Sequence, residues 1–500
     1  MKRILWIDDE IASLKSLILL LENNDCFVQE VSNGDDGCEI LQKENFDLIL
    51  LDEIMPGKDG LATLKQIKEI NPSIPVVMIT KSEEISMIDR AYTRGVNDFL
   101  SKPLNPNQLI STCKRLLERE NLISREIPQD YTKFYQTITQ EIMDVPNWQK
   151  WKSIYLSLVS WNAKIGKHPE LQTLHQELLT QCECEFTKFV ESNYLNWLHN
   201  SDTPPLSINI IPDFVIPHTM NYKRVYLIIL DCLRFDQYLS IRPYLQELFK
   251  LKEDFYSSIL PSATPFARNA IHSGLYPREI SIKYPELWDP EENKHEDKLL
   301  ALQLRRFNLQ SAYIKVRNLG EELNLKKNIK KFKSQQIVSI VINFLDYLVH
   351  AKYESAVLDE LVPDEQALCS LTTIWFSRSH LYELLRELAQ EGNPIILTTD
   401  HGAILVRHPT IIYGSKAISH NLRYKYGPAL RCDPKHALFI QNPAEYKLPG
   451  NFRYGLAKED YYFTYPTHPQ EYASRYRLTF QHGGISMQEM IIPCITLISK

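Results

Sequence analysis

Short apolar runs recur along this chain, and five of them stop at an aspartate. Runs of this length that are rich in Ile, Val and Leu are typical of strands buried on both faces. Because ligands of open α/β sheets bind beyond the carboxyl ends of the strands, acids at these positions predict sites for divalent metal or phosphate. Two runs precede residue 60 and three follow residue 220, so we expect two separate sites. The runs are Ile4–Ile7 before Asp8, Leu48–Leu51 before Asp52, Val225–Leu230 before Asp231, Ile337–Leu345 before Asp346, and Ile395–Thr399 before Asp400.

The first 120 residues alternate between strand and helix patterns. Such alternation predicts a doubly wound, flavodoxin-like α/β domain with a parallel sheet. The expected elements are strands at Arg3–Ile7, Cys26–Val31 and Leu48–Leu51, with helices near Ile11–Asn23 and Asp35–Glu44.

The pattern from about Gln108 to Asn200 predicts helices, and this segment contains few glycines. An aromatic stripe at spacings of three and four is typical of a core or an interface, and less often of a nucleic-acid platform. The stripe is Trp148, Trp151, Ile154, Tyr155, Leu158 and Trp161. We therefore predict three domains: an α/β domain at 1–120, a helical bundle linker at 121–205, and a second α/β domain at 206–500.

Composition narrows the class of protein. The 500 residues carry a net charge of −6, which argues against a protein that coats nucleic acid. Nine cysteines without zinc-ribbon spacing fit a reducing cytoplasm. No segment approaches the roughly 20 apolar residues of a membrane helix. We expect a cytoplasmic protein without a membrane span.

Asp8, Asp9 and Asp52 are expected at neighbouring strand ends, where three carboxylates suit Mg²⁺. Thr80 ends the next strand, and Lys102 follows another. A hydroxyl and an ammonium beside a metal-bound carboxylate are what a phosphoryl group on that carboxylate needs.

These motifs resemble the receiver domain of two-component response regulators. They are Ile-Asp-Asp-Glu, Leu-Leu-Asp-Glu-Ile-Met-Pro-Gly-Lys-Asp-Gly, Ile-Thr and Phe-Leu-Ser-Lys-Pro-Leu, in order within residues 1–120. The resemblance implies that a cognate histidine kinase phosphorylates Asp52, that Asp8 and Asp9 bind Mg²⁺, and that phosphorylation favours a homodimer. It further implies that Thr80 and Lys102 sense the phosphoryl group and that Phe99 is the aromatic switch.

The later aspartates are accompanied by histidines. His401 follows Asp400 directly, His350 follows Asp346 by four residues, and His482 follows a strand-like run at Tyr476–Phe480. Asp with neutral His is the ligand set of Zn²⁺ or Mn²⁺. Three aspartates and three histidines can hold two metal ions, and such a pair of ions is suited to phosphoryl transfer.

A nucleophile is expected at Thr264. Thr264-Pro265 predicts a helix start with threonine as the N-cap, where an anion is favoured. The alternatives are a plain helix cap and Ser262 as the nucleophile.

The second domain resembles PglZ-type domains of the alkaline phosphatase superfamily. The matching pieces are Ile-Leu-Asp231-Cys-Leu-Arg-Phe-Asp, Ser-Ala-Thr264-Pro-Phe-Ala-Arg-Asn, Asp346-Tyr-Leu-Val-His350, Thr-Asp400-His401-Gly and His482-Gly-Gly. The resemblance implies one Zn²⁺ on Asp231, Thr264, Asp400 and His401, and another on Asp346, His350 and His482. Arg268 and Asn269, with Arg234, are the candidates for binding the substrate phosphate. The basic run Lys326–Lys333 and the stretch Gly414–Gly427 could guide a polyanion, or could simply be solvated surface.

The whole arrangement resembles PorX-like response regulators, a family associated with type IX secretion. That resemblance implies a zinc phosphodiesterase acting on short or cyclic oligonucleotides. The alternative is a phosphorylation-switched regulator that binds a sigma factor or secretion component and keeps a structural metal site. Direct DNA binding is disfavoured by the acidic charge and the lack of a recognisable reading helix.

Overall fold

The computed structural model describes residues 2–80, 95–166, 168–200, 203–291, 293–332, 334–351, 360–415, 419–466 and 475–500. The chain forms two compact units, Met1–Phe134 and Tyr135–Lys500, which are described separately. Lys333 and Lys416, which belong to the two basic stretches considered above, lie outside the described residues.

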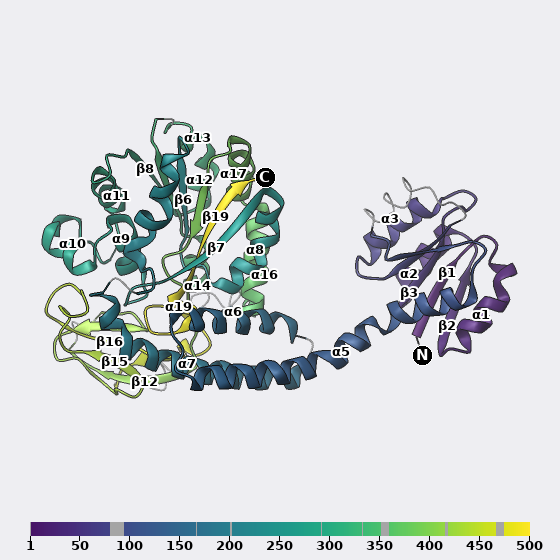
Figure 1. The fold of residues 1–500 in the computed structure, drawn as a ribbon, viewed down its shortest axis with the longest axis horizontal. Helices are drawn as coiled ribbons and strands as arrows, with labels where there is room; N and C mark the ends of the chain where they lie inside the picture. The colour runs from purple at the N-terminus through teal and green to yellow at the C-terminus, as the bar shows by residue number, and fades with distance from the viewer. Residues whose placement is uncertain are drawn as a thin grey trace. The chain divides into compact units, whose positions relative to one another are not determined.

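The first unit contains a parallel five-stranded sheet in the order β2-β1-β3-β4-β5 (Figure 1). This is the predicted doubly wound α/β fold. The strands are β1 (Lys2–Ile7), β2 (Cys26–Val31), β3 (Leu48–Asp52), β4 (Val76–Thr80) and β5 (Asp98–Ser101). The helices are η1 (Ile11–Leu14), α1 (Lys15–Glu22), α2 (Gly34–Lys43), α3 (Gly60–Ile70) and the beginning of α5 (Pro106–Met143).

Alternation along the central strands explains why both faces of this sheet are covered. Ile4 and Trp6 point into a core with Ile18 of α1 and Leu109 of α5. The alternate residues of the same strand, including Ile7, pack on the other face against α2 and α3. Successive strand residues face opposite ways, so continuously apolar strands need helices on both sides.

The aromatic stripe is a helix–helix core. It lies on α6 (Trp148–Lys164), which packs against α7 (Pro169–Trp197). Trp151 is buried and meets Phe186 of α7 edge-on, with ring centroids 5.4 Å apart. The core interpretation of the stripe is therefore confirmed.

The second unit is built on a six-stranded sheet in the order β7-β19-β10-β6-β9-β8. The four strands from β10 to β8 run parallel, and β19 is antiparallel to both of its neighbours. These strands are β6 (Val225–Leu230), β7 (Phe249–Ser257), β8 (Ser311–Val316), β9 (Ile337–Ile342), β10 (Ile395–Thr398) and β19 (Ile491–Ser499).

Helices flank this sheet. One core joins β6 to η3, α9 and α11, while α8 and α17 contact β19. The helical segments are η2 (Ser207–Asn209), η3 (Ile210–Val215), η4 (Ile216–Met220), α8 (Phe235–Leu248), α9 (Thr264–Ser273), α10 (Pro277–Lys283), η5 (Pro285–Leu287), α11 (Glu296–Arg305), α12 (Leu319–Leu323), α13 (Leu325–Ile329), α14 (Phe344–Ala351), α16 (Glu365–Arg378), α17 (His380–Glu391) and α19 (Met487–Met490).

Short strands between β10 and β19 return the chain to the sheet edge. The antiparallel pair β11 (Ile404–Leu405) and β18 (Phe480–Gln481) aligns Ile404 with Gln481, which brings His482 back beside the segment after β10. The remaining strands form two three-stranded sheets: β14 (Arg431–Cys432), β12 (His408–Tyr413) and β17 (Tyr461–Thr464), and β13 (Tyr424–Gly427), β16 (Arg453–Ala457) and β15 (Ala437–Ile440).

Three local expectations were wrong. The run Ile337–Leu345 is two elements: β9 ends at Ile342, and Asp346 lies in the first turn of α14. An apolar strand followed at once by an apolar helix gives one continuous run, so periodicity does not separate them. The run Tyr476–Phe480 contributes only Phe480 to a strand, because Tyr476 is helical and Leu478 has a φ of 61°.

The start of α9 lies one residue earlier than predicted. Ala263 is the N-cap, with extended backbone angles of φ −143° and ψ 149°, and Thr264 is the first helical residue. Proline follows within the first turn, where its missing N–H costs nothing. Thr264 still lies at the helix N-terminus. Among the described residues, no helix is both long and apolar enough to span a membrane.

Candidate metal centres and active site

The first unit gathers three acids at the carboxyl edge of its sheet. Asp8 follows β1 and Asp52 ends the adjacent β3, so the β1–β3 register places them side by side. Ligand atoms of Asp8, Asp9 and Asp52 lie within 4.8 Å of one another. Lys102 Nζ is 3.0 Å from Asp8 Oδ2 and 3.1 Å from Asp52 Oδ1.

The electrostatics of this cluster favour the binding of a cation. Burial raises the pKa of Asp52 to about 6 and the charge of Asp8 adds to the rise, while Lys102 opposes both. Burial acts to lower the pKa of Lys102, but Asp8 and Asp52 raise it above its ordinary value. Three carboxylates around one ammonium therefore fit a divalent, oxygen-binding cation such as Mg²⁺.

Thr80 and Phe99 lie on the two neighbouring strands. Thr80 ends β4, and its hydroxyl donates to the carboxylate of Glu53, the residue after Asp52. Phe99 on β5 is opposite Met78 of β4 and packs partly buried against the core. The contact from Glu53 was not anticipated from the sequence.

The second unit brings Asp231, Asp400 and His401 together. Asp231 follows β6 and Asp400 follows the adjacent β10, because Ile229 pairs with Thr398. Their ligand atoms lie within 4.8 Å of one another, and all three residues are buried. Thr264 Oγ1 lies 2.9 Å from His401 Nε2 and 3.4 Å from Asp231 Oδ1, so the hydroxyl at the start of α9 faces this cluster.

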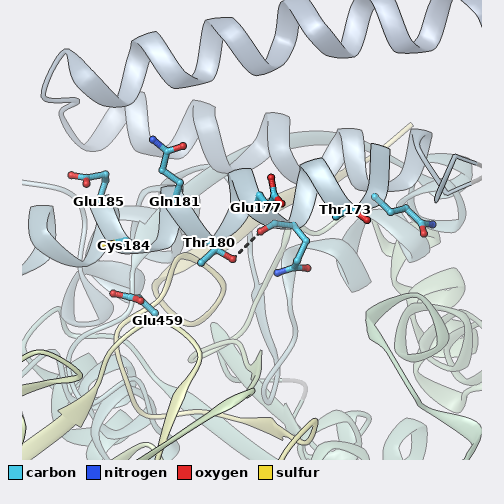
Figure 2. Close-up of a pocket in the computed structure, with 9 residues that line it drawn as sticks. Thr173, Glu177, Thr180, Gln181, Cys184, Glu185 and Glu459 are labelled. Atoms are coloured by element: carbon cyan, nitrogen blue, oxygen red, sulfur yellow. Dashed lines mark hydrogen bonds between the residues drawn. The ribbon is translucent and has the colours of Figure 1, made fainter. Parts of the chain in front are cut away.

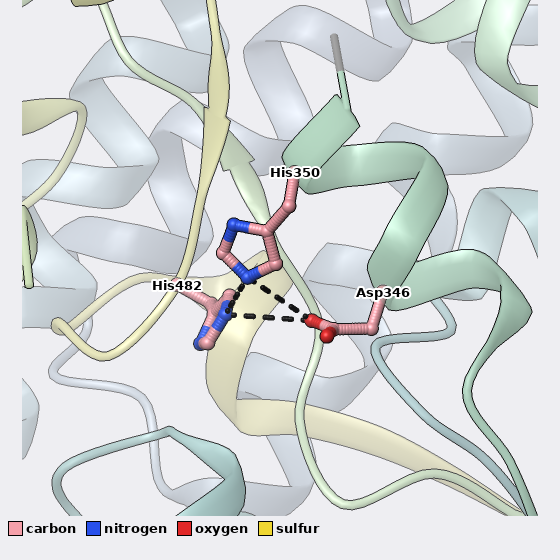
Figure 3. A group of neighbouring side chains, drawn as sticks. All are labelled: Asp346, His350 and His482. Carbon is pink, nitrogen blue, oxygen red and sulfur yellow. Dashed lines mark hydrogen bonds and ion pairs between the residues drawn. The ribbon is translucent and has the colours of Figure 1, made fainter. Parts of the chain in front are cut away.

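A second cluster adjoins the first. Figure 3 shows Asp346 and His350, one turn apart on α14, pointing at His482. Nε2 of His350 is 3.3 Å from Asp346 Oδ1 and 3.2 Å from Nε2 of His482, which is itself 3.6 Å from Asp346 Oδ1. The rings of His401 and His482 stack with centroids 4.2 Å apart, so the two clusters are neighbours.

These spacings fit tetrahedral zinc. With bonds of about 2.0–2.2 Å, two ligand atoms of a tetrahedral Zn²⁺ are about 3.3–3.6 Å apart. The Asp346–His350–His482 triad spans 3.2–3.6 Å. Within the described part of the chain, the buried oxygens Asp346 Oδ1 and Asp400 Oδ2 accept no hydrogen bond, as expected of atoms that bind a cation.

The charges also favour cations here. Burial raises the pKa of Asp231 well above its ordinary range; Arg268 opposes this rise and Asp400 adds to it. Burial, and then His401, lower the pKa of His482 and keep its imidazole neutral. Burial acts to raise the pKa of Asp346, but His350 lowers it below its usual value. Buried carboxylates with neutral imidazoles are a zinc donor set.

Arg268 and Asn269 contact the site from within α9. Arg268 is 1% exposed; its guanidinium pairs with Asp231 and Glu296, and Nη1 is 3.7 Å from Asp400 Oδ2. Asn269 Nδ2 donates to Asn293 Oδ1 at 2.9 Å, and Asn293 Nδ2 donates to the Thr264 carbonyl at 3.1 Å. Both side chains thus support the residues of the cluster. Arg234 donates to the Ala403 carbonyl and pairs with Asp236.

Other candidates are bound elsewhere. Ser262 Oγ donates to the Gly484 carbonyl at 2.7 Å, and the contacts at the first cluster belong to Thr264. Lys326 pairs with Glu383 and Glu387. In the stretch Gly414–Gly427, Arg423 is buried against Glu489 and Lys425 is buried against Tyr465. His420 of that stretch is exposed.

Sequence reasoning missed Asn343, whose Nδ2 donates to Asp231 Oδ2 at 2.8 Å. Asn343 directly follows β9, so it has the strand-end position that was assigned to Asp346. A prediction that ended β9 at Ile342 would have identified Asn343 as a strand-end residue. Glu296, which binds Arg268, lies on α11 and gave no strand-end signal.

Three family models match the chain. The response regulator receiver domain matches residues 4–114, the PorX response regulator linker domain matches residues 121–198, and the BREX system PglZ alkaline phosphatase-like domain matches residues 212–497.

Curated relatives match the receiver region. The transcriptional regulatory protein ResD of Bacillus subtilis is 35% identical over 24% of this chain and 50% of its own length. ZraR of Escherichia coli K12 is 35% identical over 25% of this chain and 28% of its own length. The chain thus spans half or less of the length of these relatives.

Solved receiver domains are also similar to this region. A CheY-like receiver from Methanospirillum hungatei is 26% identical, with a TM-score of 0.24, over 24% of this chain and 97% of that one. The NtrX receiver of Brucella abortus is 32% identical, with a TM-score of 0.22, over 23% of this chain and 98% of that one.

The PglZ match covers more than half of the chain, and the receiver and linker matches precede it in order. The five-stranded sheet, the linker helices and the strand-end aspartates agree with these matches. The chain therefore belongs to the PglZ alkaline phosphatase-like family, and its receiver domain, linker and effector domain together have the make-up of a PorX-like two-component response regulator.

Proposed function

We propose that this response regulator carries a metal-dependent phosphodiesterase that acts on short or cyclic oligonucleotides, and that its output serves the regulation of type IX secretion. The observation that carries the proposal is the position of Thr264. Its hydroxyl lies at a helix N-terminus, 2.9 Å from His401 and 3.4 Å from Asp231, beside two adjoining Asp/His clusters. A nucleophile, two cation sites and an anion-favouring helix end are what phosphoryl transfer requires.

The first cation would bind to Asp231, Thr264, Asp400 and His401, and the second to Asp346, His350 and His482. When bound, a zinc pair supplies positive charge to the attacking and leaving oxygens of the phosphodiester. Arg268 and Asn343 both donate to Asp231 and orient that carboxylate.

The chemical step then belongs to Thr264. Its Oγ1 gives its proton to solvent water and bonds to phosphorus, while the bond from phosphorus to the ester oxygen breaks and that oxygen takes a proton from water. Water next breaks the bond between phosphorus and Thr264 Oγ1 and releases the phosphate monoester. The first backbone N–H groups of α9 favour the negative charge that develops on the phosphoryl oxygens.

The receiver domain would control this effector. A histidine kinase phosphorylates Asp52, with Mg²⁺ on Asp8, Asp9 and Asp52. Thr80 and Lys102 then contact the phosphoryl group, and Phe99 responds to the movement of Thr80. The support is the clustering of Lys102 with Asp8 and Asp52 at the sheet edge.

The test is hydrolysis of bis-p-nitrophenyl phosphate and of a panel of linear and cyclic oligonucleotides, before and after chelation and Zn²⁺ addition. We expect zinc-dependent turnover that Thr264→Ala abolishes while zinc stays bound. Thr180→Ala is the matched control, since that hydroxyl lies on α7 and donates to the Gln176 carbonyl at 2.8 Å. No turnover by the zinc-loaded wild type would favour the binding-protein alternative, in which the chain acts on a sigma factor or secretion component.

A further inference from the structure

We propose that helix α7 of the linker is built into the catalytic centre, with Tyr194 and Glu183 as positioning residues for the two loops that carry Thr264 and His482. This inference rests on the proposed phosphodiesterase function. The linker would then help to position the catalytic residues of the effector domain, in addition to connecting that domain to the receiver.

Tyr194 binds the loop that leads to Thr264. The side chain is 1% exposed, and its hydroxyl accepts a hydrogen bond from the Leu260 backbone N–H at 2.7 Å. Leu260 lies four residues before Thr264, between the end of β7 and the start of α9. In this irregular segment the backbone N–H of Ile259 is likewise bound by a side chain, that of Ser207, at 3.1 Å. Side chains therefore fix the path of the loop.

Glu183 binds the loop that follows His482. Its carboxylate is buried and accepts from the Met487 backbone N–H at 2.9 Å. Met487 begins α19, and residues 483–486 connect it to His482. The same loop is bound from the other direction, because the Gly484 N–H donates to Glu489 at 2.8 Å. Loss of the Glu183 contact would loosen one end of this loop.

The two loops are joined, and α7 meets both with one face. Ser262 Oγ, between Leu260 and Thr264, donates to the Gly484 carbonyl at 2.7 Å. Glu183 and Tyr194 are eleven residues apart, which is about three helical turns, so their side chains project from the same face of α7. A different, polar face with Glu177 and Gln181 lines a surface depression of about 850 Å³ (Figure 2).

The geometry predicts distinct effects for the two contacts. Without the Tyr194 hydroxyl, the buried Leu260 N–H loses its acceptor and the loop before Thr264 relaxes. A small misplacement of a nucleophile lowers kcat more than it changes KM, and we expect a fall in kcat of about 10- to 100-fold. Without an acceptor at position 183, His482 loses its fixed position, and the second cluster should retain zinc less well.

The experiment uses the full-length chain with zinc. Tyr194→Phe, Glu183→Leu and Glu183→Gln are compared with wild type in kcat and KM for bis-p-nitrophenyl phosphate, and in zinc content after competition with a chelator. Glu183→Gln keeps an oxygen acceptor for Met487, so it should retain zinc where Glu183→Leu loses it. Thr187→Val is the matched control: it removes a buried hydroxyl of α7 for which the described residues offer no partner. Glu177→Leu controls for the loss of a glutamate on the polar face.

The outcomes separate the inference from the proposed function. A lowered kcat at constant KM in Tyr194→Phe, with wild-type behaviour in both controls, supports the inference. Wild-type kcat in Tyr194→Phe together with equal zinc retention in Glu183→Leu and Glu183→Gln overturns it, and so does an equal loss in the controls. If the wild type itself shows no turnover, the proposed function fails, and zinc retention by the two Glu183 variants still decides whether α7 supports the metal site.

Discussion

Arg268 is the central positive charge of the effector site. It is buried between Asp231 and Glu296, and Lys315 pairs with Glu296 at 2.9 Å. Burial acts to raise the pKa of Glu296, but Arg268, followed by other cations, lowers it to about 2. Arg268 thus keeps Glu296 ionised and opposes the rise in the pKa of Asp231, because a guanidinium cannot lose its proton.

Removal of this guanidinium should be costly in the metal-free protein. Arg268→Met removes the guanidinium that pairs with two buried carboxylates, and loss of one member of a buried pair typically costs about 3–5 kcal/mol. We expect the free energy of unfolding in urea to fall by this order, and bound zinc to offset part of the loss. Arg242→Met removes an arginine that pairs with Glu253 at a half-exposed position and serves as control. An unchanged urea midpoint for Arg268→Met would contradict this role.

Glu183 should make stability depend on pH. Burial raises the pKa of Glu183 to about 8; the Met487 N–H opposes this rise and Glu489 adds to it. Two further groups face the carboxyl: Arg423 lowers its pKa, and Glu459 raises it. The folded pKa lies above the unfolded value, so this group's contribution is full below about pH 4.5 and is lost as pH rises through about 8.

Glu183→Gln mimics the protonated acid and removes this dependence. We expect the variant to gain stability over wild type as pH rises from 5 to 8, by on the order of 3–5 kcal/mol at the upper end. Urea unfolding of both proteins at pH 5, 6.5 and 8 measures the difference. A constant difference across the three pH values would show that Glu183 does not titrate in this range.

At the scale of elements, the sequence predicted best where strands are wholly buried. β1 from Ile4 onward, β3 up to Leu51, β6 and β10 are buried, mostly apolar runs, so the ends of these strands and the acids placed there followed from periodicity. The boundary between β9 and α14 was missed because both are apolar. Non-local pairings, such as β19 between β7 and β10, leave no local pattern and were not predicted.

The loop after β10 contains a tight contact that should be sensitive to one methyl group. A Cβ on Gly402 would lie 2.0 Å from the Gln488 backbone oxygen, a clash that backbone must move to relieve. Since Gly402 follows His401, we expect Gly402→Ala to lower stability by about 1–3 kcal/mol and to reduce zinc retention at the first cluster.

Thermal unfolding and zinc content of Gly402→Ala test this expectation. Gly166→Ala is the matched control, because the nearest atoms to its added Cβ are 3.8 and 3.9 Å away. Equal thermal midpoints and zinc contents for the two variants would show that the loop accommodates the methyl group.

At the scale of the whole molecule, each unit carries its own acidic centre at the carboxyl edge of a sheet. The two centres differ in chemistry. Among the described residues, the receiver cluster combines carboxylates with an ammonium, which suits a hard cation and a transient aspartyl phosphate. The effector clusters combine carboxylates with imidazoles, which suits zinc and hydrolysis. A signal on Asp52 and turnover at Thr264 should therefore be separable by substitution.

Phosphodonor treatment with Mg²⁺ should shift the wild type from monomer to dimer, as measured by light scattering after size exclusion. Asp52→Ala should stay monomeric, because it has no carboxylate to accept the phosphoryl group, whereas Asp35→Ala, at an exposed acid that pairs with Lys58, should dimerise normally. Thr264→Ala should also dimerise, since the switch lies in the receiver, and unphosphorylated Asp52→Ala should keep wild-type turnover. A dimer formed by treated Asp52→Ala would place the switch outside the acidic cluster, and loss of dimerisation in Thr264→Ala would mean that the two centres do not act independently.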